Sequence, residues 1–148
     1  MCARIDAVLA TVQEFAARTG AERVVALLDC EPPVMVERLE DGTLQVTSGE
    51  TARPAAPGRA AALPLPELRA VPASALSADP ETGELSAPLG GVRLLVDSVL
   101  ALAGALGGRS VATATFPTRN PATPLTVAAR EGEPVVLDIA GRHFAFPA

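Results

Sequence analysis

Two stretches of the chain carry apolar residues at the spacing of a helix. In residues 4–18 the apolar positions recur every three or four residues and form one stripe, which predicts an amphipathic helix with one buried face. Arg4, Thr11 and Arg18 are seven positions apart, so we expect them together on the outward face. In residues 92–106 apolar side chains cover most of the circumference, which predicts a buried helix.

Short β-prone runs follow each predicted helix. Residues 22–29 contain a continuous apolar run, Val24 to Leu28, typical of a strand covered on both faces or of a central strand. The runs at 34–39 and 43–48 flank Glu40-Asp41-Gly42, which favours a hairpin. After the second helix we predict strands at 110–116, 124–129, 134–139 and 142–146. In the last of these, alternation directs Phe144 and Phe146 to the core and His143 away from it.

A segment of different composition separates the two groups of elements. Residues 49–66 place prolines among Ala, Gly and Arg, which predicts a long surface loop with little regular structure that the core does not need. Residues 67–71 favour a short strand. Residues 75–78 and 84–87 flank a turn at 79–83, which favours a second hairpin.

The order of the elements repeats. A helix followed by β-strands occupies residues of about 3–48 and again of about 84–147, joined by the Pro- and Ala-rich connection at 49–66. Two such units pack naturally side by side, with the helices in one layer and a shared antiparallel sheet in the other. The sequence therefore predicts a single α+β domain over residues 1–148, with two layers, pseudo-twofold symmetry, about two helices and eight to ten strands.

Composition narrows the functional classes. A hydrophobic content of 49% over 148 residues supports a sizeable core, and a net charge of −5 argues against general nucleic-acid binding unless the arginines gather on one face. All twelve basic residues are Arg, which indicates the coding bias of a GC-rich bacterial genome. The longest apolar run, 98–108, is too short to span a membrane. Because no signal peptide and no disulfide framework are indicated, we expect a cytoplasmic protein.

Part of the chain resembles one domain of a DNA sliding clamp. Residues 95–102 resemble the clamp helix that ends a domain. Residues 111–116, 124–127 and 144–147 resemble the strands that close a domain, including a proline at the end of the final strand. The likeness covers residues 84–147 and reaches the first half only through the order strand–helix–three strands. Clamp rings contain several such domains, so the resemblance implies a non-enzymatic protein that either forms a larger homo-oligomer or works alone.

The resemblance also implies DNA as a partner, because the clamp helices that face DNA are basic. A few phosphate contacts per subunit are weak alone but add up around a ring. The alternative is that the candidate arginines are solvated or pair with Glu14 and Asp97. The DNA-facing candidates are Arg4 and Arg18 on the first helix, and Arg93 and Arg109 at the ends of the second.

Small residues line another side of the second predicted helix: Ala101, Gly104 and Ala105, with Gly108 just beyond. Small side chains allow another backbone to approach closely. Two interpretations are open. These residues either pack against the first helix or the sheet, or they form a subunit interface.

Catalytic, metal and cofactor motifs are weak. Cys30 and His143 are the one candidate thiol–imidazole pair, and Cys30 directly follows a strand, where a small buried residue is the simpler interpretation. One His and two Cys do not make a structural zinc site without carboxylates, and the acidic residues fall mostly in turns. Gly90-Gly91 lacks the other features of a phosphate loop. We therefore expect no catalytic, metal-binding or cofactor-binding residues.

Three functional hypotheses remain at this point. The first is a non-enzymatic, clamp-like or scaffold protein that self-associates and binds a partner, with DNA or a protein as candidates. The second is a small-ligand-binding or regulatory module with a pocket beside the Pro-rich loop. The third, the least favoured, is a Cys30-dependent enzyme.

Overall fold

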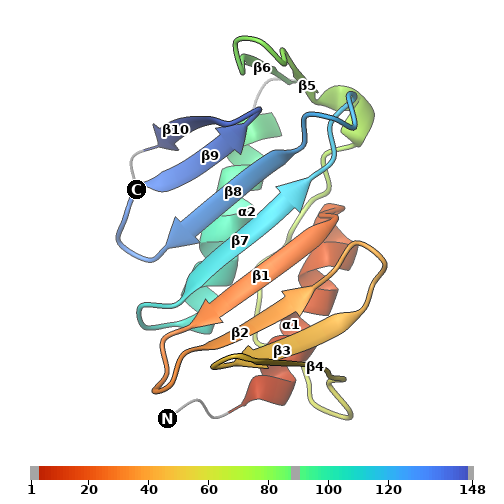
Figure 1. The fold of residues 1–148 in the computed structure, drawn as a ribbon. Coiled ribbons are helices and arrows are strands. Elements are labelled where there is room, and N and C mark those ends of the chain that lie inside the picture. The colour runs from red at the N-terminus through yellow and green to blue at the C-terminus, as the bar shows by residue number, and fades with distance from the viewer. Residues whose placement is uncertain (1–3, 88–90, 147–148) are drawn as a thin grey trace.

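The computed structural model describes residues 4–87 and 91–146. It is an α+β fold, as the sequence predicts, in which two helices pack on one large antiparallel sheet (Figure 1). Neither described helix is long and apolar enough to cross a membrane. The elements are α1 (Ile5–Thr19), β1 (Arg23–Leu28), β2 (Val34–Arg38), β3 (Leu44–Ser48), β4 (Thr51–Pro54), a 3-10 turn η1 (Ala73–Ala75), β5 (Ser77–Ala78), β6 (Leu85–Ser86), α2 (Gly91–Leu106), β7 (Val111–Phe116), β8 (Leu125–Arg130), β9 (Val135–Ile139) and β10 (Arg142–Phe146).

The sheet has eight strands in the order β10-β9-β8-β7-β1-β2-β3-β4, and every neighbouring pair is antiparallel. Strands β5 and β6 form a separate two-stranded hairpin. Figure 1 shows both helices behind the same face of the sheet, α1 behind the β1–β4 half and α2 behind the β7–β10 half. The opposite face has no helix on it.

The two halves are related by a pseudo-twofold axis at the centre of the sheet. Val25 of β1 pairs with Thr113 of β7, and Thr113 lies 88 positions after Val25, at the equivalent position of the second half. The buried positions of the helices repeat at an offset of 87, so Phe15 corresponds to Leu102, and both are fully buried. Each half is therefore one helix followed by four strands, one strand more than we predicted for the first half.

Local sequence signals explain where the elements end. The first helix stops at Gly20, whose φ of 79° is easy only for glycine, and whose N–H donates to the carbonyl oxygen of Ala16. The β2–β3 hairpin turns at Gly42 (φ 90°), as Asp41-Gly42 predicts. The β3–β4 and β9–β10 hairpins each have a two-residue loop, Gly49-Glu50 and Ala140-Gly141.

The core lies between the helices and the sheet. The largest fully buried side chains are Phe15 of α1 and Phe116 of β7, and the rest of the core is mostly Val, Leu and Ala. Along β7 and β8 the residues alternate between buried and half-buried positions. This alternation is expected for strands with one covered face.

The structure decides between the two alternatives predicted for residues 22–29. Strand β1 is a central strand and is not covered on both faces, because Leu27 points to the helix-free side and is 42% exposed.

The prediction for Thr11 is wrong, because Thr11 does not lie on the outward face with Arg4 and Arg18. Its side chain is buried, and its Oγ1 donates to the Ala7 carbonyl oxygen at 2.6 Å and accepts from the Leu63 N–H at 2.8 Å.

The connection between the halves is more ordered than predicted. Its first part forms edge strand β4, which pairs with β3. Leu63 and Leu65 then pack against the core, so the connection is part of the helix layer. Residues 67–71 form no strand, whereas the predicted hairpin at 75–87 is present as β5 and β6.

The last strand also differs from expectation in one respect. Phe146 packs against the core as predicted, but Phe144 is 42% exposed. Strand β10 lies at the edge of the sheet, next to β9 only. The alternation was correctly predicted, but alternation does not say how far the helix layer extends over the sheet.

Candidate functional site

The predicted DNA-facing arginines do not gather on one face. Arg18 pairs with Glu14 at 2.7 Å and Arg93 pairs with Asp97 at 3.1 Å, both within a helix. Arg4 precedes α1 and Arg18 lies in its last turn, so the length of the helix separates them by roughly 21 Å. The structure therefore matches the alternative of solvated or paired arginines for Arg18 and Arg93. DNA binding stays a prediction.

Arg4 and Arg109 lie at separate hollows. Arg4 lines a pocket of about 350 Å³ together with Asp29 and Leu63. Arg109 lines a smaller pocket of about 140 Å³ with Leu27 and Arg130. Leu28 and Asp29 line both pockets, so the carboxylate of Asp29 lies between the two arginines.

The small-residue side of α2 faces outward. Gly104 is exposed, and a Cβ added there would meet nothing within 4 Å. Ala101 and Ala105 are half-buried, and Ala105 and Gly108 line the same pocket as Arg4. Close packing inside this chain therefore does not explain the small residues, and their role as an interface stays a prediction.

Cys30 and His143 are far apart. Strands β7, β8 and β9 separate β1, which Cys30 follows, from β10, which carries His143. Four spacings of about 4.8 Å put the two residues roughly 19 Å or more apart. Cys30 is disulfide-bonded, contrary to our expectation of no disulfide, and therefore offers no thiolate nucleophile in this state. His143 instead faces Asp138, with Nδ1 3.4 Å from Oδ2.

Metal-ligating side chains do not cluster in the described part of the chain. Within residues 4–87 and 91–146 there is no group of three His, Cys, Asp or Glu placed to hold a metal ion. Asp41 and Asp79 have pKa values below the ordinary value, in each case chiefly because backbone N–H groups of their own turn donate to the carboxylate. Both carboxylates therefore stabilise the turns in which they lie.

Two pockets lie beside the Pro-rich connection, where we predicted one. The first is the pocket of Arg4 and Leu63 between the two helices. The second, of about 410 Å³, lies between Pro66, Leu68 and Arg69 of the connection and Leu94 and Asp97 of α2. Both are open hollows with mixed polar and apolar walls.

The uncovered face of the sheet carries an uncharged band that the sequence analysis missed. The register places one row of directly opposed residues across β10, β9, β8, β7 and β1, and a second row, two residues along, across β7, β1, β2, β3 and β4. These ten residues are uncharged, and each row ends at a charged residue, because Glu37 lies opposite Val25 and Arg130 lies opposite Val111. The first row is Val25, Thr113, Ala128, Val136 and Ala145; the second is Val111, Leu27, Met35, Thr47 and Ala52.

Charged residues on this face adjoin the band: Glu37 and Arg130 continue its two rows, and Arg23, Asp138 and His143 lie in the next row. Arg23 pairs with Glu37 across β1 and β2, and Arg130 pairs with Glu133 at 3.4 Å. Among the described residues, four large apolar side chains are at least 40% exposed, and two of them, Leu27 at 42% and Val136 at 40%, belong to the band. The pattern within one strand does not reveal the band, because only the register between the strands brings its residues side by side.

Comparison of the chain with protein-family models, with curated proteins and with solved structures finds no match to any of them.

Proposed function

We propose that this protein is a non-enzymatic scaffold that self-associates by stacking the uncovered face of its sheet on the same face of a second copy. The observation that carries the proposal is the uncharged band across that face. An antiparallel sheet that faces water normally alternates apolar and polar positions. Here only one of the six outward positions on the two central strands is charged: Arg23, Val25 and Leu27 on β1, and Val111, Thr113 and Thr115 on β7.

The size of the face supports a second copy as the partner. Eight strands of about five residues cover roughly 38 by 17 Å, or about 650 Å². A stable protein–protein interface buries about 800 Å² per partner, which a face of this size approaches. A twofold interface uses the same patch on both subunits, so the band of one copy can pack on the same band of a second copy.

Native mass tests this proposal. Light scattering on a sizing column is expected to give twice the 15.1 kDa of one chain for the wild type. Leu27→Arg places a charge in the middle of the band and is expected to give a monomer. Leu94→Arg is the matched control, because Leu94 is also 42% exposed but lies on α2. A wild-type monomer, or equal effects of the two variants, would overturn the proposal.

A small-ligand-binding module is the second candidate, carried by the pocket of about 410 Å³ between the connection and α2. Pockets of this size are typical of small-molecule sites. Leu68 is its main apolar wall on the connection, so Leu68→Asp is expected to abolish binding of a neutral hydrophobic dye at this position. Retained dye binding would remove this candidate.

A further inference from the structure

An apolar pocket of about 320 Å³ lies where the β5–β6 hairpin meets the β10 edge of the sheet. Its walls come from four elements: the hairpin, the first turn of α2, β9 and β10. Almost all of the lining is carbon, and the half-exposed Phe144 forms part of it. The apolar side chains that line it are Leu85, Val92, Leu137, Ile139, Phe144 and Phe146.

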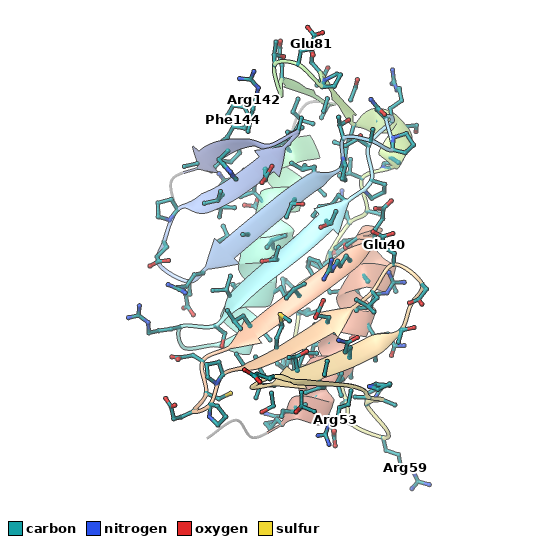
Figure 2. All side chains as sticks on the ribbon, viewed as in Figure 1. Glu40, Arg53, Arg59, Glu81, Arg142 and Phe144 are labelled. Carbon is teal, nitrogen blue, oxygen red and sulfur yellow. The ribbon has the colours of Figure 1, made fainter. Side chains whose placement is uncertain are left out.

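The hairpin above this pocket is fixed in place. Nη2 of Arg142, the first residue of β10, donates to the Glu81 carbonyl oxygen at 2.6 Å. Figure 2 shows Arg142 on β10 below the hairpin that carries Glu81. The Arg142 side chain also packs on Gly83, where a Cβ would lie 2.7 Å from Cδ. Asp79 closes the turn by accepting from the Glu81 N–H at 2.8 Å, so the pocket is preformed.

Beside the pocket, β10 presents a free sheet edge. In a two-residue hairpin the residues that flank the loop form a hydrogen-bonded pair, and such pairs alternate along the ladder. Arg142 flanks the β9–β10 loop, so the N–H and C=O groups of His143 and Ala145 point away from β9, toward the edge. All five residues of β10 are exposed or half-buried. These backbone groups are therefore available to a further strand.

The other edge of the sheet is less suited to such pairing, because it lacks one backbone donor. In β4 the corresponding outward positions are Ala52 and Pro54. Pro54 is related to Ala145 by the pseudo-twofold axis, and proline has no N–H to donate. Edge strands commonly carry proline for this reason. Strand β10 has no proline among its described residues.

The hairpin also gives this region a negative charge. Asp79, Glu81 and Glu84 are all exposed, and Arg142 is the nearby cation that the structure ties to the hairpin. Glu84 lines both the apolar pocket and an adjacent hollow that it shares with Asp79 and Glu81. A partner that fits both surfaces carries an apolar side chain next to a cation.

We propose that β10 and this pocket form a docking site for an extended peptide segment of another protein, in which apolar residues alternate with polar ones and end in Arg or Lys. The segment adds antiparallel to β10 as a ninth strand. Its residues opposite Phe144 and Phe146 point to the helix side and fill the pocket. Its C-terminal end then lies at Arg142, where its cation meets Glu84 and Glu81.

A second copy of this chain fits the site less well than such a peptide. Paired with itself, β10 supplies Phe144 but no unengaged cation, because its Arg142 is already bound to Glu81. The pocket lies on the helix side of β10, whereas the uncharged band reaches β10 at Ala145 on the opposite face. The docking proposal therefore stands apart from self-association of the sheet face.

The test uses a fluorescent peptide with the sequence acetyl-Thr-Phe-Thr-Leu-Thr-Arg-amide and measures its anisotropy with the full chain. In the proposed pairing the threonine N–H groups face β10, whereas those of Phe and Leu face solvent. Methylation of the threonine nitrogens is expected to weaken binding at least tenfold. Methylation of the Phe and Leu nitrogens is the matched control and is expected to leave it within twofold.

Two protein variants test the same geometry from the other side. Ala145→Pro copies Pro54 onto β10 and is expected to weaken binding at least tenfold, while Pro54→Ala on β4 leaves it unchanged. Replacing the peptide Arg with Glu is expected to weaken binding at least fivefold. Leu27→Arg, on the uncovered face, is expected to have no effect on peptide binding, which separates this proposal from self-association.

The outcomes are decisive in either direction. Absence of binding at millimolar protein, equal loss for the two methylation patterns, or full binding by Ala145→Pro would each overturn the proposal. A dimer that Ala145→Pro dissociates but Leu27→Arg does not, without peptide binding, would mean that two copies pair through β10 and would also overturn the proposal. If Ala145→Pro does not fold, the methylated peptides with the wild-type chain decide alone.

Discussion

The two halves of the molecule are alike at the centre of the sheet and differ at its two edges. At the centre, β1 and β7 are equivalent by symmetry, and the buried Val24, Ala26 and Leu28 correspond to Ala112, Ala114 and Phe116. At the edges, β4 ends in Pro54 whereas β10 carries Phe144 and Phe146 beside an apolar pocket. The comparison teaches that packing against a common core keeps the two halves alike, while their outer strands meet different surroundings.

The helices differ in a similar way. Thr11 in α1 and Ser98 in α2 are equivalent, and each donates its hydroxyl to the carbonyl oxygen four residues earlier. Thr11 in addition accepts the N–H of Leu63, because the connection between the halves crosses the helix layer there. No second bond of this kind involves Ser98 in the described residues. Because the connection passes beside Thr11, the Thr11 hydroxyl makes one hydrogen bond more than the equivalent hydroxyl of Ser98.

The largest expected effect comes from the equivalent core positions Phe15 and Leu102. Replacement by alanine leaves a cavity, so Phe15→Ala is expected to lower the free energy of unfolding by about 3–5 kcal/mol and Leu102→Ala by about 2–5 kcal/mol. Urea unfolding followed by circular dichroism measures both. Because the halves share one sheet, each variant is expected to show a single transition. Two separated transitions in either variant would mean that the halves unfold independently.

A smaller effect separates Thr11 from Ser98. Thr11→Val keeps the shape but leaves the Leu63 N–H without its acceptor, which is expected to lower the free energy of unfolding by about 1–3 kcal/mol. Ser98→Ala is the matched control and is expected to cost at most about 1 kcal/mol, because it removes one local bond. Urea unfolding of the two variants side by side measures the difference. Equal costs would show that the connection does not stabilise the helix layer through Thr11.

Substitutions in the loops of the two edge hairpins are expected to change the free energy of unfolding in opposite directions. Ala140 has a φ of 53°, which costs an L-residue about 1 kcal/mol, while the β3–β4 loop has Gly49 at 62°. Ala140→Gly is therefore expected to raise the free energy of unfolding by up to about 1 kcal/mol. Gly49→Ala, where no atom lies within 4 Å of the added Cβ, is expected to lower it by a similar amount. Thermal or urea unfolding checks the signs, and a loss in Ala140→Gly would contradict the strain.

The smallest expected effect is the loss, at low pH, of the stabilisation that ionised Asp79 gives to its turn. The backbone N–H groups of Glu81 and then Thr82 lower the pKa of Asp79 below its ordinary 3.8. A lowered pKa in the folded state means a stabilisation that is present above pH 3.8 and is lost as the pH falls through the folded pKa. The amide NMR signals of Glu81 and Thr82 are expected to move with a midpoint below pH 3.8. Asp41, which accepts from the Thr43 N–H in the β2–β3 turn, provides the comparison in the other half. A midpoint at or above 3.8 would contradict the hydrogen bonds of the Asp79 turn.

Periodicity and turn residues determined most of the fold from the sequence alone. The apolar stripe of 4–18, the apolar run of 92–106 and the turns at Gly20 and Asp41-Gly42 locate both helices and the first hairpin, because these signals are local. Strand β4 and the irregular stretch at 67–71 were misjudged. In both cases the decision rests on neighbours distant in the chain: β3 pairs with β4, and α2 lies against residues 66–69.

Local sequence pattern was enough to predict the two helices, most of the antiparallel strands and the repeated order of the elements. Tertiary structure alone decided that Thr11 is buried, that Phe144 is half-exposed, and that Leu27 and Val136 lie in one uncharged band. The physical reason is that local pattern fixes which face of a strand or helix a residue occupies. Whether that face meets the core, solvent or a sheet edge depends on register and strand order, which bring together residues distant in the sequence.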